Sequence, residues 1–241
     1  MGKRALLIVN EKSRAADREL SEGVALLKAS GLALIRDSTS AIADSIRHHR
    51  NSIDLVILGG GDGTLHSAAS ALVEAKLPLG IVPLGTANDL ARTLAIPQLP
   101  LEAFRVIAQG RLREIDVGKV NGIYFFNVAN IGLGVGVTRE LSSEIKRRWG
   151  VLAYSRGVAR ALKAHRPFSV RIICDGASET LRTIQVAVGN GRHYGGGMTI
   201  DNQAQLDDSL LHVYSVEPTP WWRLAGVALA LKHGRPQNAI E

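Results

Sequence analysis

Cysteine is almost absent from this chain. Its 241 residues include a single cysteine, Cys174, so no disulfide bond can form within the chain. Disulfides are typical of oxidising compartments, and we therefore expect a reducing compartment and a cytoplasmic location. Because Cys174 ends the alternating apolar run 168–174, we expect a buried structural thiol rather than a reactive nucleophile.

Long apolar runs and aromatic residues are also scarce. Residues 5–9 are too short an apolar run for a secretory signal, and the longest late run, 224–231, is far short of a membrane span. Aromatic residues make up 5% of the chain and do not alternate with basic ones, which argues against a platform on which nucleic-acid bases stack. Trp221 and Trp222 are candidate interfacial anchors for peripheral membrane association, and a packed helix is the alternative. The net charge of +7 suits nucleic acid, nucleotide and anionic lipid alike.

Two common nucleotide motifs are missing as well. The chain has no Gly-Lys-Ser/Thr triplet of a Walker A loop, and no GxGxxG follows the first apolar run. Instead, residues 59–64 read GGGDGT, between the β-rich run 53–58 and a helical pattern at 65–75. A glycine turn between strand and helix lets backbone N–H groups approach a phosphate closely. Asp62 would repel phosphates unless a cation lies between them, so it indicates Mg²⁺ and phosphoryl chemistry.

The first 110 or so residues alternate between strand and helix patterns, which predicts a mostly parallel sheet covered on both faces. Ligands of such sheets bind at the carboxyl ends of the strands. Asn10, the turn at 59–64 and a second small-residue turn at 85–89 all follow apolar runs, so we expect them to converge. Strands are expected at 5–9, 32–35, 53–58 and 80–83, and helices at 16–29, 41–50, 65–75, 90–94 and 101–108.

The pattern then changes to β-rich runs joined by short turns. Asn121-Gly122 and Asp175-Gly176 lie between such runs and are strong hairpin signals. We therefore place a boundary near Gly118, with an α/β nucleotide domain at 1–117 and a mainly antiparallel domain at 118–241. Strands of the second domain are expected at 114–120, 123–130, 168–174, 180–188 and 210–216.

Several blocks of the chain carry a family resemblance. The sequence resembles the diacylglycerol/lipid kinase catalytic family, and in particular its bacterial lipid kinases, over nearly the whole chain and in the right order. NAD kinases share the GGDGT turn, but the PLGTAND block is the lipid kinase version. The matching blocks are GGGDGT at 59–64, PLGTANDLAR at 83–92, IDVG at 115–118, FNVANIGLG at 126–134, GNG at 189–191, GGG at 195–197 and LDDSL at 206–210.

The resemblance implies a fold and a donor site. The expected fold is an N-terminal three-layer α/β domain of the NAD kinase/diacylglycerol kinase type, followed by a mainly antiparallel β-sandwich domain that is incomplete at its C-terminus. ATP would bind between the two. The residues expected to line the nucleotide are Asn10, Gly60, Gly61, Asp62, Gly63, Thr64, Leu65, His66, Thr86 and Asn88.

The resemblance also implies two magnesium sites. Asp62, Asp89 and Asp116 would be the catalytic carboxylates, in a network with water that holds the catalytic Mg²⁺. A second, structural Mg²⁺ would be held by the side chain of Asp208 and the carbonyl groups of Gln205 and Leu210. For Asp89 the alternative is a place in the first turn of a helix, and for the trio around Asp208 it is an ordinary surface turn.

The chain departs from the family pattern in places. Asn10-Glu11 replaces Asn-Pro, and Ser209 stands where a glycine usually follows the aspartate. The family normally ends with an Asp-Gly-Glu block that supplies the proposed general base, and no such block occurs up to Glu241. Two explanations of the missing block are open. The chain is a shortened lipid kinase, or it is a catalytically impaired homologue that binds nucleotide or lipid. We prefer the first, because the PLGTAND block and Asp62 are intact.

The leading hypothesis is therefore an ATP- and Mg²⁺-dependent lipid kinase that phosphorylates a hydroxyl of diacylglycerol or a related lipid. One alternative is a small-molecule kinase of the NAD kinase type, and another is the catalytically impaired homologue. The expected partners are a lipid at a membrane surface and a nucleotide, with no nucleic acid. A homodimer is compatible with these residues.

Overall fold

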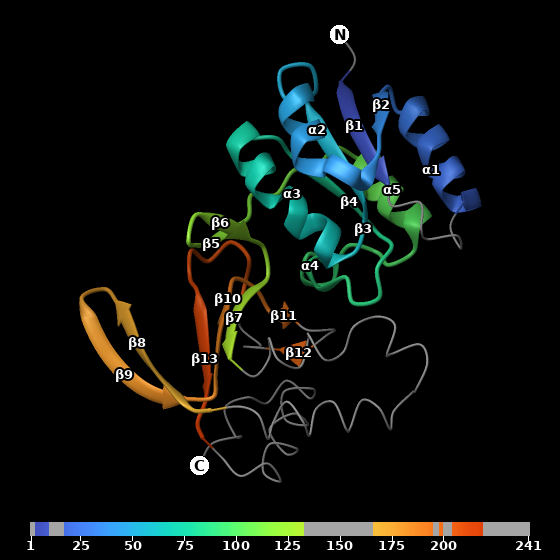
Figure 1. Cartoon of the computed structure of the whole chain (residues 1–241). Coiled ribbons are helices and arrows are strands. Elements are labelled where there is room, and N and C mark those ends of the chain that lie inside the picture. The colour runs from blue at the N-terminus through green and yellow to red at the C-terminus, as the bar shows by residue number, and fades with distance from the viewer. Residues whose placement is uncertain (1–2, 10–16, 133–165, 195–197, 200–203, 219–241) are drawn as a thin grey trace. The chain divides into compact units, whose positions relative to one another are not determined.

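The computed structural model describes residues 3–9, 17–132, 166–194, 198–199 and 204–218 (Figure 1). The chain forms two compact units. The first consists of Met1–Asn127, Asn190–Gly197 and Gln203–Leu210, and the second of Val128–Gly189, Met198–Asn202 and Leu211–Glu241. The division into domains at 1–117 and 118–241 that the sequence indicated stays a prediction.

A four-stranded parallel sheet forms the centre of the first unit. Its strands lie in the order β2-β1-β3-β4, so the chain starts inside the sheet and crosses over with a helix at each step. This is the parallel arrangement that the alternating pattern predicted. The strands are β1 (Arg4–Val9), β2 (Ala33–Asp37), β3 (Leu55–Gly60) and β4 (Leu79–Pro83).

Helices cover both faces of this sheet, which gives three layers. Alternate residues of a strand point to opposite faces, so Leu6 and Ile8 of β1 enter one core while Ala5 and Leu7 enter the other. The first core is closed by α2 (Ile42–His49) and α3 (Asp62–Ala75), and the second by α1 (Asp17–Ala29) and α5 (Pro100–Ala108).

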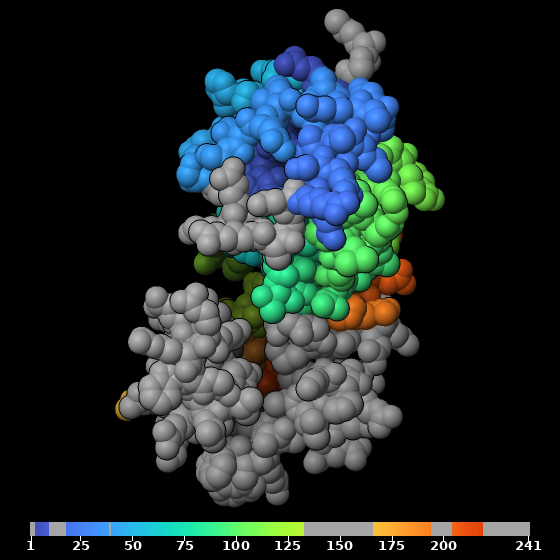
Figure 2. All heavy atoms as spheres, turned by 90° about the vertical axis from the view of Figure 1, so that its right-hand side faces the viewer, coloured from blue at the N-terminus to red at the C-terminus, as the bar shows by residue number. Residues whose placement is uncertain are grey.

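The face formed by α1 and α5 depends on one close fit. Phe104 of α5 is fully buried, and a Cβ on Gly23 of α1 would lie 2.0 Å from its ring. Glycine at position 23 therefore lets the two helices approach each other. Figure 2 shows this face from outside, with the blue of α1 beside the green of α5.

The remaining elements of the first unit are short. A 3-10 turn (Thr39–Ala41) precedes α2, and α4 (Asp89–Thr93) follows the second glycine turn. A hairpin of β5 (Gly118–Val120) and β6 (Ile123–Phe125) turns at Asn121-Gly122, as predicted. β11 (His193–Tyr194) is a two-residue strand.

The second unit is antiparallel. β7 (Val128–Gly132), β10 (Gln185–Gly189) and β13 (His212–Val216) form a sheet with β10 in the middle, and β12 is Met198–Thr199. A separate hairpin, β8 (Phe168–Cys174) and β9 (Ala177–Thr183), turns at Asp175-Gly176. The expected fold class, α/β followed by antiparallel β structure, is confirmed.

Two expected strands are each divided in the structure. The run 123–130 becomes β6 and β7, because Phe126 packs into the core of the first unit and Asn127 hydrogen-bonds there before β7 begins. The run 180–188 becomes β9 and β10. The break follows Thr183, whose Oγ1 accepts from the N–H of Gln185 and donates to the carbonyl oxygen of Val216.

The prediction of a buried Cys174 is wrong. Cys174 is exposed, because it is the last residue of β8 beside the hairpin turn, in a ribbon of only two strands. None of the described helices is long and apolar enough to cross a membrane. Asn10, Trp221 and Trp222 lie outside the described residues.

Candidate functional site

The two glycine turns lie against each other at the carboxyl ends of β3 and β4. The N–H of Leu84 donates to the carbonyl oxygen of Gly60 at 3.0 Å, which extends the strand pairing into the turns. A Cβ on Gly85 would lie 2.5 Å from the Cα of Gly61, so side chains at these positions would separate the two backbones. The convergence of 59–64 with 85–89 is therefore present in the structure.

The first turn ends sooner than the sequence indicated. α3 begins at Asp62 rather than Leu65, with Gly61 as its N-cap residue. Gly63 is exposed, and a Cβ on it would meet nothing within 4 Å. Thr64 is half-buried and His66 exposed, whereas the side chain of Leu65 belongs to the hydrophobic core.

The carboxylate of Asp62 binds the start of α4. Its Oδ2 accepts from the N–H of Asp89 at 3.1 Å, and its Oδ1 accepts from the N–H of Leu90 at 3.2 Å. It therefore supplies the acceptor that the first turn of α4 needs, since no side-chain hydrogen bond from Asn88 caps that helix. Oδ1 also accepts from Nδ2 of Asn127 at 3.3 Å. The structure thus brings Asp62 and Asp89 together.

Asn88 holds the second turn in shape. Its Oδ1 accepts from the N–H of Gly85 at 2.9 Å, and its Nδ2 donates to the carbonyl oxygen of the same residue at 3.0 Å and to Oε1 of Gln98 at 3.1 Å. Asn88 is only 7% exposed and has a φ of 52°, in the left-handed region. Its side chain therefore acts within the turn, while Thr86 is exposed beside it.

Asp89 and Asp116 have different surroundings. Asp89 is 4% exposed at the start of α4. Asp116 lies in the segment between α5 and β5, and its Oδ2 accepts from the N–H of Ser209 at 2.6 Å. Among the described residues, no group of three or more His, Cys, Asp or Glu side chains is placed to hold a metal ion. The three carboxylates therefore do not form a protein cage for a cation.

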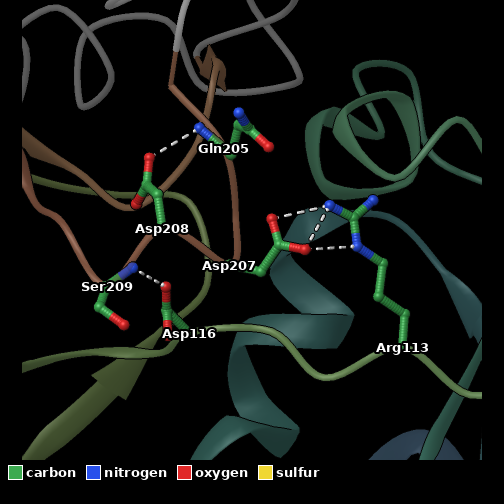
Figure 3. A network of polar contacts seen from close by, with 6 residues as sticks. All are labelled: Arg113, Asp116, Gln205, Asp207, Asp208 and Ser209. Atoms are coloured by element: carbon green, nitrogen blue, oxygen red, sulfur yellow. Dashed lines mark hydrogen bonds and ion pairs between the residues drawn. The ribbon is translucent and has the colours of Figure 1, made fainter.

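The loop 205–210 is closed by its own hydrogen bonds (Figure 3). The carboxylate of Asp208 accepts from the N–H of Gln205 at 3.0 Å, as the figure shows. It also accepts from the N–H of Leu210 at 2.9 Å. The structure thus brings together the three residues predicted to hold a structural Mg²⁺. They contact one another through hydrogen bonds from N–H groups to the Asp208 carboxylate, and such bonds form without a cation. The second metal stays a prediction.

An ion pair connects this loop to the segment before Asp116 (Figure 3). Nη2 of Arg113 lies 2.9 Å from Oδ1 of Asp207, and its Nε lies 3.2 Å from Oδ2. The side chains are 52% and 40% exposed, so the pair contributes little to stability, on the order of 0–1 kcal/mol. Because the pair is bidentate, it orients the Arg113 and Asp207 side chains relative to each other more than it adds to the free energy of unfolding.

His193 lies against α4 in the first unit. Its Nδ1 is 3.2 Å from Oγ1 of Thr93. Partial burial, followed by the nearby charge of Arg192, lowers the pKa of His193 below its usual value; Asp89 opposes this shift and Arg92 adds to it. The ring is therefore neutral near pH 7 and can take part in hydrogen bonds as donor or acceptor.

Sequence reasoning missed several residues of this region. Asn127 and Asn190 lie in blocks that carried the family resemblance, FNVANIGLG and GNG, so a signal for them was present. Asp207 lies in a third such block, LDDSL, but for its partner Arg113 no signal existed, because a charged pair 94 residues apart is ordinary surface composition until the fold brings the two together.

Known protein families match both parts of the chain. Residues 4–120 match the model of the diacylglycerol kinase catalytic domain, and residues 128–235 match that of the YegS C-terminal NAD kinase beta sandwich-like domain. A probable YegS-like lipid kinase of Klebsiella pneumoniae is 35% identical over 216 residues, which are 87% of this chain and 72% of that protein. This chain belongs to the YegS-like lipid kinase family.

A second YegS-like protein and a solved diacylglycerol kinase structure are also similar to the chain. A probable YegS-like lipid kinase of Pseudomonas aeruginosa is 35% identical over 91% of this chain and 74% of its own length. The crystal structure of a diacylglycerol kinase from Bacillus anthracis is 29% identical, with a TM-score of 0.75 over 96% of this chain and 77% of its own. Like its YegS-like relatives, the chain is a kinase.

Proposed function

We propose that this kinase transfers the γ-phosphate of ATP, with Mg²⁺, to a hydroxyl of diacylglycerol or a related lipid. The observation that carries the proposal is the contact between the two glycine turns, with Asp62 joining them at the N-terminus of α3. A site for a phosphate donor needs a backbone that the phosphates can approach closely, N–H groups that donate to them, and a nearby carboxylate that can bind a cation. These features occur together here.

The start of α3 supports a phosphate site. Gly61 offers no side-chain acceptor to cap this 14-residue helix, so N–H groups of the first turn remain for phosphate oxygens. The positive end of the helix dipole also lies at this N-terminus, where it attracts the negative charge of a phosphate. Gly63 is exposed with free space around it, which suits a backbone that a triphosphate approaches.

The residues fit a magnesium ion that arrives with the nucleotide. Mg²⁺ is usually held by one or two carboxylates together with phosphate oxygens and water, not by an all-protein cage. Asp62 meets this description, because its Oδ2 accepts a single hydrogen bond, from the N–H of Asp89, and keeps a lone pair for a cation. When bound, the ion would neutralise charge on the phosphates. The protein's part is to hold Asp62 and the two turns in fixed positions.

The lipid acceptor rests on the relatives. The relatives from Klebsiella and Pseudomonas are named probable lipid kinases, and the solved neighbour is titled a diacylglycerol kinase. A lipid substrate would be met at a membrane surface, since its tails do not dissolve in water. Peripheral association with that surface is part of the proposal.

A transfer assay tests the proposal directly. The protein is incubated with γ-labelled ATP, Mg²⁺ and mixed micelles containing diacylglycerol, ceramide or phosphatidylglycerol, with NAD⁺ as a separate acceptor. We expect label in a lipid that requires Mg²⁺ and is absent with NAD⁺. Binding of ATP without label in any lipid would contradict the proposal, and label in NAD⁺ would favour the NAD kinase alternative.

A charge-removing variant tests the role of Asp62. Asp62→Asn keeps the size of the side chain but removes its negative charge, so we expect kcat to fall by about 10²-fold or more. Asp44→Asn makes the same chemical change at an exposed residue of α2 that pairs only weakly with Arg47, and should retain activity. Full activity of Asp62→Asn would refute the metal role of this carboxylate.

A further inference from the structure

Asn190 connects two segments that are distant in the sequence. It follows β10, is 1% exposed, and donates three hydrogen bonds. Its backbone N–H donates to the carbonyl oxygen of Asn127 at 2.7 Å. Its side-chain Nδ2 donates to the carbonyl oxygen of Asp116 at 2.6 Å and to that of Phe126 at 3.0 Å. One residue thus fixes the segments 115–117 and 125–127 to each other.

Each of these segments leads to one of the proposed acidic residues. Asp116 is itself held by Asn190 through its main chain, while its carboxylate is free to meet the N–H of Ser209. Asn127 donates from Nδ2 to Oδ1 of Asp62 at 3.3 Å. The main chain of Asp116 and one of the hydrogen bonds to Asp62, the one from Asn127, are therefore both connected to Asn190.

Only a primary amide suits this position. The Asn190 side chain faces two acceptors, the main-chain carbonyl oxygens of Asp116 and Phe126. A single nitrogen with two N–H groups can donate to both. A carboxylate would place lone pairs against them, and an apolar side chain would leave them buried without a donor. The neighbouring Gly191 permits the close fit, because a Cβ there would lie 2.8 Å from Cδ2 of Leu206.

We propose that Asn190 is a positioning residue for phosphoryl transfer, an inference that rests on the function proposed above. It holds the main chain of Asp116 and, through Asn127, the carboxylate of Asp62 in one arrangement. It acts on the reaction only through these two residues. Misplacement of about 1 Å in a catalytic group is enough to cost on the order of 10²-fold in rate, so a residue of this kind controls kcat.

Asn190→Asp is the variant that separates positioning from bulk stability. The carboxyl group has the same shape, but it donates one hydrogen bond when protonated and none when ionised. We expect kcat at pH 8 to fall by about 10- to 100-fold while KM for ATP stays near its wild-type value. The deficit relative to wild type should shrink as the pH falls towards 6, because the buried carboxyl group then regains a proton.

Thr183→Val is the matched control. Thr183 is also fully buried, and its Oγ1 lies 2.7 Å from the carbonyl oxygens of Gln185 and Val216, within the second unit. Its replacement should lower the melting temperature but leave kcat unchanged well below that temperature. Asn190→Asp with a kcat within twofold of wild type, or with the same purely thermal effect as Thr183→Val, would overturn the proposal.

Asn127→Ala keeps the test open if Asn190→Asp does not fold. It removes only the link from Asn127 to Asp62, at a half-buried position, and leaves the bonds of the Asn190 side chain in place. We expect a smaller loss, about 3- to 10-fold, again in kcat rather than in KM. An unchanged kcat would show that this link does not position Asp62, and would overturn that half of the inference.

Hydrogen exchange on the same proteins distinguishes this inference from the proposed function. Peptides covering 111–118 and 124–128 should exchange faster in Asn190→Asp than in wild type, while β3 stays protected. Unchanged exchange would overturn the inference whatever the activity. A wild-type protein that labels no lipid would refute the proposed function and the positioning role of Asn190 in phosphoryl transfer together, and the exchange would still show whether Asn190 holds the segments.

Discussion

Asn88 combines a strained backbone with a side chain that satisfies the turn it belongs to. The left-handed region costs most residues about 1–2 kcal/mol, and asparagine is among the few that adopt it readily. Its amide meanwhile pairs with both polar groups of Gly85. At the residue scale, the second glycine turn therefore depends on one side chain as much as on its glycine.

Two substitutions separate these contributions. Asn88→Gly keeps the backbone conformation but loses the hydrogen bonds, and should lower the free energy of unfolding by about 1–3 kcal/mol. Asn88→Ala loses both and should cost about 1–2 kcal/mol more. Urea unfolding measures the difference. Equal stabilities of the two variants would show that the left-handed backbone is not maintained in solution.

His193 makes stability depend on pH. Its folded pKa lies below the unfolded value near 6.5, so below that pH the unfolded chain binds more protons and stability falls towards the folded pKa. Wild type should therefore lose more stability between pH 7.5 and 5.5 than His193→Gln, which cannot take up the proton. Melting temperatures at both pH values test this, and parallel losses would contradict it.

At the scale of elements, the contact of the two turns explains why small residues recur there. Gly85 meets backbone atoms, which cannot move aside as a flexible side chain can. Gly63, one residue into α3, meets nothing. Two glycines of the same site thus have opposite structural requirements.

This difference predicts opposite effects of the same substitution. Gly85→Ala should destabilise the protein by about 1–3 kcal/mol, since the new Cβ would lie 2.5 Å from the Cα of Gly61. Gly63→Ala should stabilise it by about 0.5–1 kcal/mol, because alanine favours the helix. Thermal unfolding of both variants provides the measurement. A neutral Gly85→Ala would show that the turns are farther apart than described.

The same scale shows how far sequence alone could go. Periodicity located β1, β3, β4, α2 and α5 within a residue or two, because these elements are set by local apolar patterns. It missed the start of α3 at Asp62, since a Gly-Asp-Gly run predicts a turn locally and only the fold makes it helical. The contacts of Asn190 and Arg113 were beyond reach for a different reason: their partners are remote in sequence, and no periodicity records them.

At the scale of the whole molecule, a bound nucleotide should stabilise the first unit selectively. An unreactive ATP analogue with Mg²⁺ at 100 times its Kd would add about 2.7 kcal/mol to the free energy of unfolding. Exchange protection should increase in peptides covering 59–66 and 85–90 and remain unchanged in the β8–β9 hairpin. Equal protection in both regions would contradict a nucleotide site formed by the glycine turns.

The first unit contains three separate stretches of chain, and the last ends at Leu210. During synthesis, which proceeds at roughly 5–20 residues per second, the parallel sheet can form seconds before Asn190 emerges. Until then, the carbonyl groups of Asp116 and Phe126 lack their final donor. The nascent chain would therefore pass through a stage in which the sheet is folded but the region around Asp116 is unfinished, and catalytic competence would arrive late in translation.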